Sequence, residues 1–198
     1  MVFDKKKLLI NIVLTILYAI ITFFVVLHHE IWVDELQVWQ LVSNLSVVEL
    51  FKRLSNEGHP ALFYLLVMPL AKMSLSVFSL QILCWLFSVA GVFVLLQFSP
   101  FKWWCSLAIV LSSGFMYSFP VIARSYSLLP FLMFIAAILY GKRKEQPILY
   151  AISLFLISQI HVIMFIFVFV LTLYFGIEMK KENKFTKKNI AAFVIMNL

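Results

Sequence analysis

The chain has 198 residues, of which 64% are hydrophobic and only 13% charged, and its mean hydropathy is +1.03. Soluble domains are typically about half apolar and about a quarter charged, so this composition excludes an ordinary water-soluble globule and a disordered chain. The apolar runs are continuous rather than alternating, which also excludes an outer-membrane barrel. The 16 basic residues lie between apolar segments, as the positive-inside rule expects, so we predict no nucleic-acid partner. An all-α, polytopic bundle of transmembrane helices remains.

The first apolar run follows a cluster of lysines at positions 5–7 and covers residues 8–27. It has about the 20 residues that a helix needs to cross a bilayer. The run is too long for the apolar region of a typical signal peptide, and no small-residue cleavage site precedes His28 and His29. We therefore predict a retained span with a cytoplasmic N-terminus.

The longest polar-rich stretch covers residues 28–59 and holds five of the nine acidic residues. Apolar side chains between positions 47 and 54 recur at helical spacing, with charged residues off that stripe, which is typical of a helix lying on a membrane surface. We predict an outer loop over about 28–76 that contains amphipathic juxtamembrane helices.

Further apolar runs predict the remaining spans of a single integral membrane domain over residues 1–198. The last run contains only nine residues, too few to cross a bilayer, so we expect the chain to stop in mid-helix. The predicted spans after the first are 78–99, 103–119, 127–140, 147–160 and 162–177, with the start of another at 190.

The segment 61–76 decides the predicted topology. If it crossed the membrane, most Lys and Arg residues would lie outside. If it lies along or dips into the outer leaflet, most of them lie inside, as the positive-inside rule requires. Lys72 also weakens this segment as a span. We therefore predict a multi-pass protein of the cytoplasmic membrane in which 61–76 does not cross.

This topology gathers polar residues from separate loops at the outer face. Such a gathering is what an outward-facing active site needs. The residues concerned are Asp34, Glu35, Glu57, His59, Arg124 and His161.

Asp34 and Glu35 follow the first span closely and allow two interpretations. They can form a helix cap in a solvated loop. Alternatively, apolar neighbours such as Trp32 and Trp39 raise the pKa of a carboxylate, which then serves as a general base for a hydroxyl proton. Two carboxylates can also hold a divalent metal ion against a phosphate, and the sequence leaves open whether a metal is needed.

Arg124 and His161 each lie between two apolar runs. Arg124 is either an interfacial arginine that reaches the lipid headgroups or a phosphate clamp, because a guanidinium matches phosphate in a bidentate way. His161 is either a hydrogen-bonded interfacial residue or part of the site.

Glu57 and His59 precede Pro60 at the start of the next apolar segment. This pattern is typical of a turn that opens a helix, and it also fits an anion site at a helix N-terminus. Lys52 and Arg53 are candidates for binding anionic lipid headgroups or the leaving phosphate.

Four segments together resemble a known family. They are 34–39 (Asp-Glu-Leu-Gln-Val-Trp), 57–66 (Glu-Gly-His-Pro-Ala-Leu-Phe-Tyr-Leu-Leu), 99–101 (Ser-Pro-Phe) and 123–128 (Ala-Arg-Ser-Tyr-Ser-Leu). Their order and spacing over roughly 30–165 resemble the bacterial membrane glycosyltransferases of the GT-C superfamily, in the RgtA/B/C/D-like, protein-mannosyltransferase-related branch. Members typically continue through several more spans, so the resemblance implies that this chain is truncated at its C-terminus.

The resemblance implies sugar transfer at the outer face of the membrane. The donor would be a polyprenyl-phosphate-linked sugar and the acceptor a glycan, a lipid or a protein, with inversion at the anomeric carbon. By this resemblance, Asp34 matches the catalytic carboxylate and Glu35 its acidic neighbour. The substrate-binding matches are His59 with Pro60, Arg124 with Tyr126 near the donor phosphate, and more loosely His161.

Two alternative functions remain open at this point. A transporter or flippase for lipid-linked sugars would place polar residues in mid-span along a path, and few occur there in this sequence. A catalytically inactive, truncated paralogue would tolerate the replacement of Asp34 and Arg124.

Overall fold

Helices make up all the regular structure of the described chain. The computed structural model describes residues 4–57 and 60–198, without the side chains of residues 56 and 57, and these ranges contain no strand. The all-α prediction is therefore confirmed. The α-helices are α1 (Lys5–Leu27), α2 (Val33–Asn44), α3 (Val47–Glu57), α4 (Leu62–Lys72), α5 (Phe78–Phe98), α6 (Trp103–Val110), α7 (Leu129–Gly141), α8 (Pro147–Ser158), α9 (Met164–Lys181) and α10 (Lys187–Met196).

Among the described residues, two helices, α1 and α5, are long and apolar enough to cross a membrane. They coincide with the predicted spans at 8–27 and 78–99. Large apolar side chains of α1, including Leu9, Ile20 and Phe24, are exposed, whereas a helix in the core of a water-soluble protein would bury most of them. These two candidate spans favour association with a membrane.

The segment predicted as a span at 103–119 is not one continuous α-helix. α6 ends at Val110, and a π-helical turn, Gly114–Ser118, follows it. The Ser112 hydroxyl donates to the carbonyl of Ile109 at 2.7 Å. Serine side chains that bond to the backbone in this way compete with helical hydrogen bonds, and Gly114 lowers the helix propensity further.

The last two helices depart from their predicted limits. α9 continues to Lys181, beyond the predicted end at 177. α10 begins before residue 190, because the Thr186 hydroxyl accepts the backbone N–H of Asn189 at 3.2 Å and caps the helix.

Helices α2, α3 and α4 occupy the predicted outer loop. α4 has 11 residues, which rise about 17 Å, well short of the about 30 Å hydrocarbon core of a bilayer. It packs beside α2, where the Lys72 ammonium donates to the Ser43 carbonyl at 2.9 Å. The predicted apolar stripe of α3 divides, because Leu50 and Leu54 are buried in the protein core while Phe51 is exposed.

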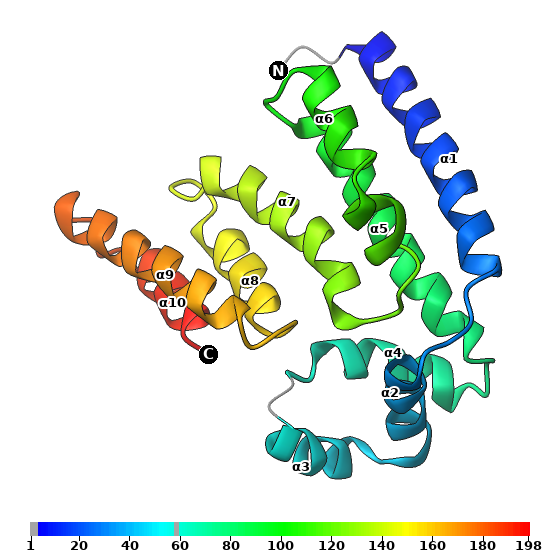
Figure 1. Cartoon of the computed structure of the whole chain (residues 1–198). Coiled ribbons are helices and arrows are strands. Elements are labelled where there is room, and N and C mark those ends of the chain that lie inside the picture. Colours follow the sequence, from blue (N-terminus) through cyan, green and yellow to red (C-terminus); the bar gives the residue numbers. More distant parts are fainter. Residues whose placement is uncertain (1–3, 58–59) are drawn as a thin grey trace.

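The long helices lie side by side, and their connections alternate between the two ends of the molecule (Figure 1). α5 contacts both α1 and α7, and α8 contacts α7, α9 and α10. Gly91 allows the close approach of α5 to α7, since a Cβ there would lie 3.1 Å from the backbone nitrogen of Phe131. α2–α4 are grouped at one end, and the α5–α6, α7–α8 and α9–α10 connections lie at the other (Figure 1). The end that carries α2–α4 also carries the candidate site.

Candidate functional site

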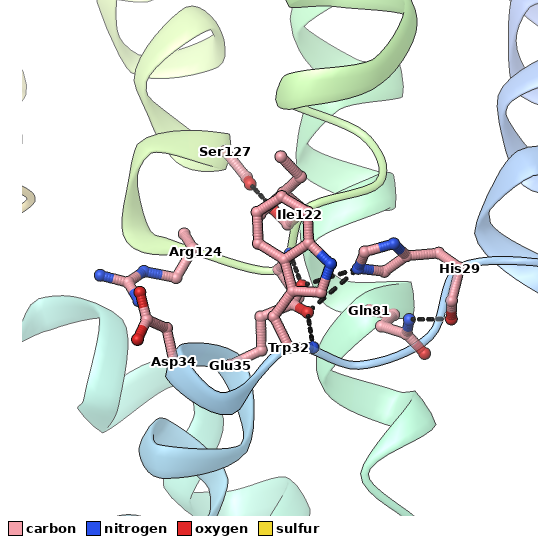
Figure 2. A network of polar contacts seen from close by, with 9 residues as sticks. His29, Trp32, Asp34, Glu35, Gln81, Ile122, Arg124 and Ser127 are labelled. Atoms are coloured by element: carbon pink, nitrogen blue, oxygen red, sulfur yellow. Dashed lines mark hydrogen bonds and ion pairs between the residues drawn. The ribbon is translucent and has the colours of Figure 1, made fainter.

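A buried carboxylate, Glu35, joins α2 to the loop that precedes α7. Its side chain is completely inaccessible to solvent. Its carboxylate accepts the backbone N–H of Trp32 at 2.6 Å and the backbone N–H of Ala123, and it lies 3.0 Å from Nε2 of His29. These contacts converge on one side chain in Figure 2. A buried carboxylate requires such partners, because an unpaired charge in the interior is strongly destabilising.

The same network reaches neighbouring elements. The side-chain amide of Gln81 on α5 donates to the carbonyl of His29 at 3.4 Å, and the Ser127 hydroxyl donates to the carbonyl of Ile122 at 2.9 Å (Figure 2). The α1–α2 connection, α5 and the loop before α7 are therefore held together at this point.

Glu35, rather than Asp34, caps α2. The helix begins at Val33, and the Glu35 carboxylate reaches back to the N–H of Trp32, as the acid does in a capping box. Asp34 lies in the first turn of the helix, and its side chain is 67% exposed. Of the two acids, Glu35 therefore has the capping role that the sequence allowed, and the Asp34 carboxylate takes no part in the cap.

Asp34 pairs with Arg124. The Asp34 Oδ2 lies 2.8 Å from NH1 of Arg124, whose side chain is 29% exposed. Figure 2 shows the two side chains facing each other, on the side of Glu35 away from His29. A guanidinium has five N–H donors, so a single contact with one carboxylate oxygen leaves it able to bind a further anion.

The ion pair lines a cavity of about 140 Å3 at this end of the molecule. Asp34 comes from α2, and His161 comes from the α8–α9 connection. Arg124 lies in the loop that precedes α7, and Tyr126 lies in the 3₁₀ turn Ser125–Leu128 that follows this loop. The other described residues that line the cavity are Gln37, Val38, Pro60, Phe63, Tyr64, Ser125 and Ile160. Predicted residues from three separate segments thus border one space.

The size of the cavity limits what it can hold. Sites for drug-sized ligands usually measure about 300–1,000 Å3, so this smaller space suits a phosphate or a single polar group. The hydroxyl of Tyr126, the ring of His161 and the guanidinium of Arg124 supply hydrogen-bond donors of the kind that a phosphate accepts.

The other predicted site residues either lie outside the described residues or do not line the cavity. The side chain of Glu57 and the whole of His59 lie outside the described residues. Lys52 and Arg53 belong to α3, and neither is among the described residues that line the cavity. Glu35 is buried behind the cavity rather than lining it.

Sequence reasoning missed His29, Gln37 and Tyr64. His29 contacts the Glu35 carboxylate because the chain turns between these two residues, and nothing in the local sequence predicts that contact. Gln37 lies one helical turn after Asp34, so its position beside the cavity follows from the 3.6-residue repeat.

Within residues 4–57 and 60–198, no group of three or more His, Cys, Asp or Glu side chains is arranged to hold a metal ion.

Comparisons with protein-family models, with curated proteins and with solved structures gave no match to the chain.

Proposed function

We propose that the chain belongs to a multi-pass membrane protein that transfers a sugar from a polyprenyl-phosphate donor to an acceptor hydroxyl. The observation that carries this proposal is the convergence of Asp34, Arg124, Tyr126 and His161 around one cavity. Transfer from a phosphate leaving group requires a base for the acceptor proton and a cation for the phosphate charge. The cavity brings such a base and cation together with two further polar groups.

The proposed topology places the N-terminus in the cytoplasm and the cavity at the outer face. Two features support it: the lysines at 5–7 form the first turn of α1, and the basic residues 142–144 lie in a connection at the opposite end from α2–α4 (Figure 1). Such an excess of Lys and Arg is typical of cytoplasmic loops. Shorter helices such as α7 and α8, with 13 and 12 residues, would then complete the bundle where the bilayer is locally thinned.

In the proposed reaction, the Asp34 carboxylate takes the proton of the acceptor hydroxyl as its oxygen bonds to the anomeric carbon of the sugar. The bond from that carbon to the phosphate oxygen breaks at the same time, and its electron pair leaves with the phosphate. The Arg124 guanidinium stabilises the charge that develops there, and this stabilisation is strong beside low-dielectric surroundings. Displacement from the opposite face inverts the anomeric configuration. Tyr126 and His161 serve as hydrogen-bonding groups for the donor headgroup.

The test is the exchange Asp34→Asn in the membrane-reconstituted protein, with transfer of a labelled sugar from a polyprenyl-phosphate donor as the readout. Loss of a general base should lower turnover by about 10²–10⁴-fold. Glu30→Gln is the matched control, because Glu30 is an exposed acid four residues earlier and does not line the cavity. Equal turnover in wild type and the Asp34 variant would remove Asp34 from the mechanism. Transport of the donor without transfer would instead favour a flippase.

A further inference from the structure

The two acids of α2 contact two consecutive residues of the loop before α7. Asp34 pairs with the Arg124 side chain, and Glu35 accepts the backbone N–H of Ala123, the residue just before it. Asp34 and Glu35 are neighbours on α2 (Figure 2), but their contacts differ in burial, since Asp34 is exposed and Glu35 is inaccessible to solvent. One acid therefore faces the cavity while its neighbour holds the loop.

The conformation of this loop depends on hydrogen bonds outside a regular helix. Arg124 has extended backbone angles, with φ −123° and ψ 164°. Its carbonyl accepts the N–H of Ser127 at 3.0 Å, and its own N–H donates to Ile122 at 2.9 Å. The Ala123 N–H donates to the Glu35 carboxylate, so Glu35 makes a long-range contact with the backbone of this stretch, beside the ion pair that Asp34 makes with the Arg124 side chain.

Glu35 is itself held firmly. His29 and Trp32 contact the same carboxylate, and the side chain of His29 is only 4% exposed. A carboxylate accepts from several donors at once, whereas a glutamine amide presents one acceptor oxygen and a donating NH₂ group. The exchange Glu35→Gln therefore sets a donor against at least one of these N–H groups with little change in volume.

We propose that Glu35 is a positioning residue: by holding the Ala123 amide it fixes the backbone before Arg124 and thereby sets the Arg124 guanidinium opposite Asp34. This inference rests on the proposed function insofar as Arg124 binds a phosphate. In this proposal Glu35 does not contact the substrate. The two adjacent acids have different roles, which match the exposure of Asp34 and the burial of Glu35.

The first measurement is backbone amide hydrogen exchange of the full chain in detergent micelles. Glu35→Leu, which removes both carboxylate oxygens, should accelerate exchange over residues 121–127, because the Ala123 N–H then loses its acceptor. Glu178→Gln is the control, since it breaks a carboxylate contact with Arg143 at the other end of the bundle and should leave that segment unchanged. Unaltered exchange over 121–127 in the Glu35 variant would overturn the proposal, whether or not the cavity binds phosphate.

The second measurement is binding of farnesyl monophosphate by titration calorimetry. Arg124→Ala should weaken binding by about 10–100-fold while leaving it measurable, and Glu35→Gln should weaken it by about tenfold through misplacement of the guanidinium. In the Arg124→Ala background, Glu35→Gln should not lower the affinity further. If Glu35→Gln acted only by destabilising the fold, it would lower the affinity in both backgrounds.

The outcomes separate the two proposals. If Arg124→Ala leaves the affinity unchanged, the phosphate site of the proposed function fails, while the exchange experiment still judges Glu35. If Arg124→Ala weakens binding and Glu35→Gln does not, or if Glu35→Gln weakens binding equally without Arg124, the positioning role is overturned.

Discussion

Two arginines at opposite ends of the bundle show how the surroundings of one side-chain type separate a structural contact from a candidate site. Arg143 donates from Nε to Glu178 at 2.7 Å, from NH2 to the same carboxylate at 2.6 Å, and from NH1 to the Tyr140 carbonyl at 2.7 Å. Its guanidinium also lies 3.9 Å from the centre of the Tyr140 ring. Arg124, by contrast, has one ion pair with an exposed carboxylate beside a cavity.

The difference lies in how many donors are already used. A guanidinium held by both oxygens of a carboxylate, a carbonyl and a ring face has little capacity for another ligand. Arg143 therefore joins the α7–α8 connection to α9, whereas Arg124 keeps donors for an anion. The following three variants test this contrast, from the largest expected effect to the smallest.

Glu35→Ala should have the largest effect on stability. It leaves the Ala123 and Trp32 N–H groups without their acceptor and leaves His29 without its partner. Breaking such a buried contact should lower the free energy of unfolding by about 3–5 kcal/mol. Unfolding in mixed micelles, followed by circular dichroism, measures the change. A loss below about 1 kcal/mol would mean that the site end does not depend on Glu35.

Glu178→Ala should have an intermediate effect on stability and none on the site. It removes two charge-assisted hydrogen bonds from Arg143, whose side chain is 14% exposed, and bonds of this kind contribute about 1.5–3 kcal/mol. The same unfolding assay measures the loss. Phosphate affinity should match wild type, and a clear fall in that affinity would contradict the independence of the two ends.

Acidification should have the smallest effect, at the end that carries Arg143. Hydrogen bonds from Lys144 and then Lys184 lower the pKa of Glu182 to about 2, below the value of about 4.3 for an unfolded chain. Because the folded pKa is the lower one, the stabilisation is present above about pH 4.3 and is lost as the pH falls toward 2. The unfolding midpoints of wild type and Glu182→Gln should therefore converge over this interval. Glu182 is exposed to solvent, so high salt should reduce the difference. Midpoints that diverge on acidification would contradict the assignment.

Local sequence patterns were sufficient for the long helices and insufficient where polar side chains act on the backbone. The apolar run that ends before His28 predicts α1 well, since about 20 apolar residues have few alternatives to a helix. The run at 103–119 looks equally apolar, yet Ser112 and Gly114 divide it. The effect of such residues depends on which backbone groups their neighbours leave free.

For the site, the sequence alone predicted that charged residues from separate segments meet at one end of an apolar bundle, and the structure brings Asp34, Arg124 and His161 to one cavity. Only the tertiary structure decided which acid faces the cavity. Adjacent residues of a helix are about 100° apart, so Asp34 and Glu35 cannot share one environment, and the choice depends on where the Ala123 backbone arrives. That contact joins residues 88 positions apart in the chain, and no periodicity within either segment encodes it.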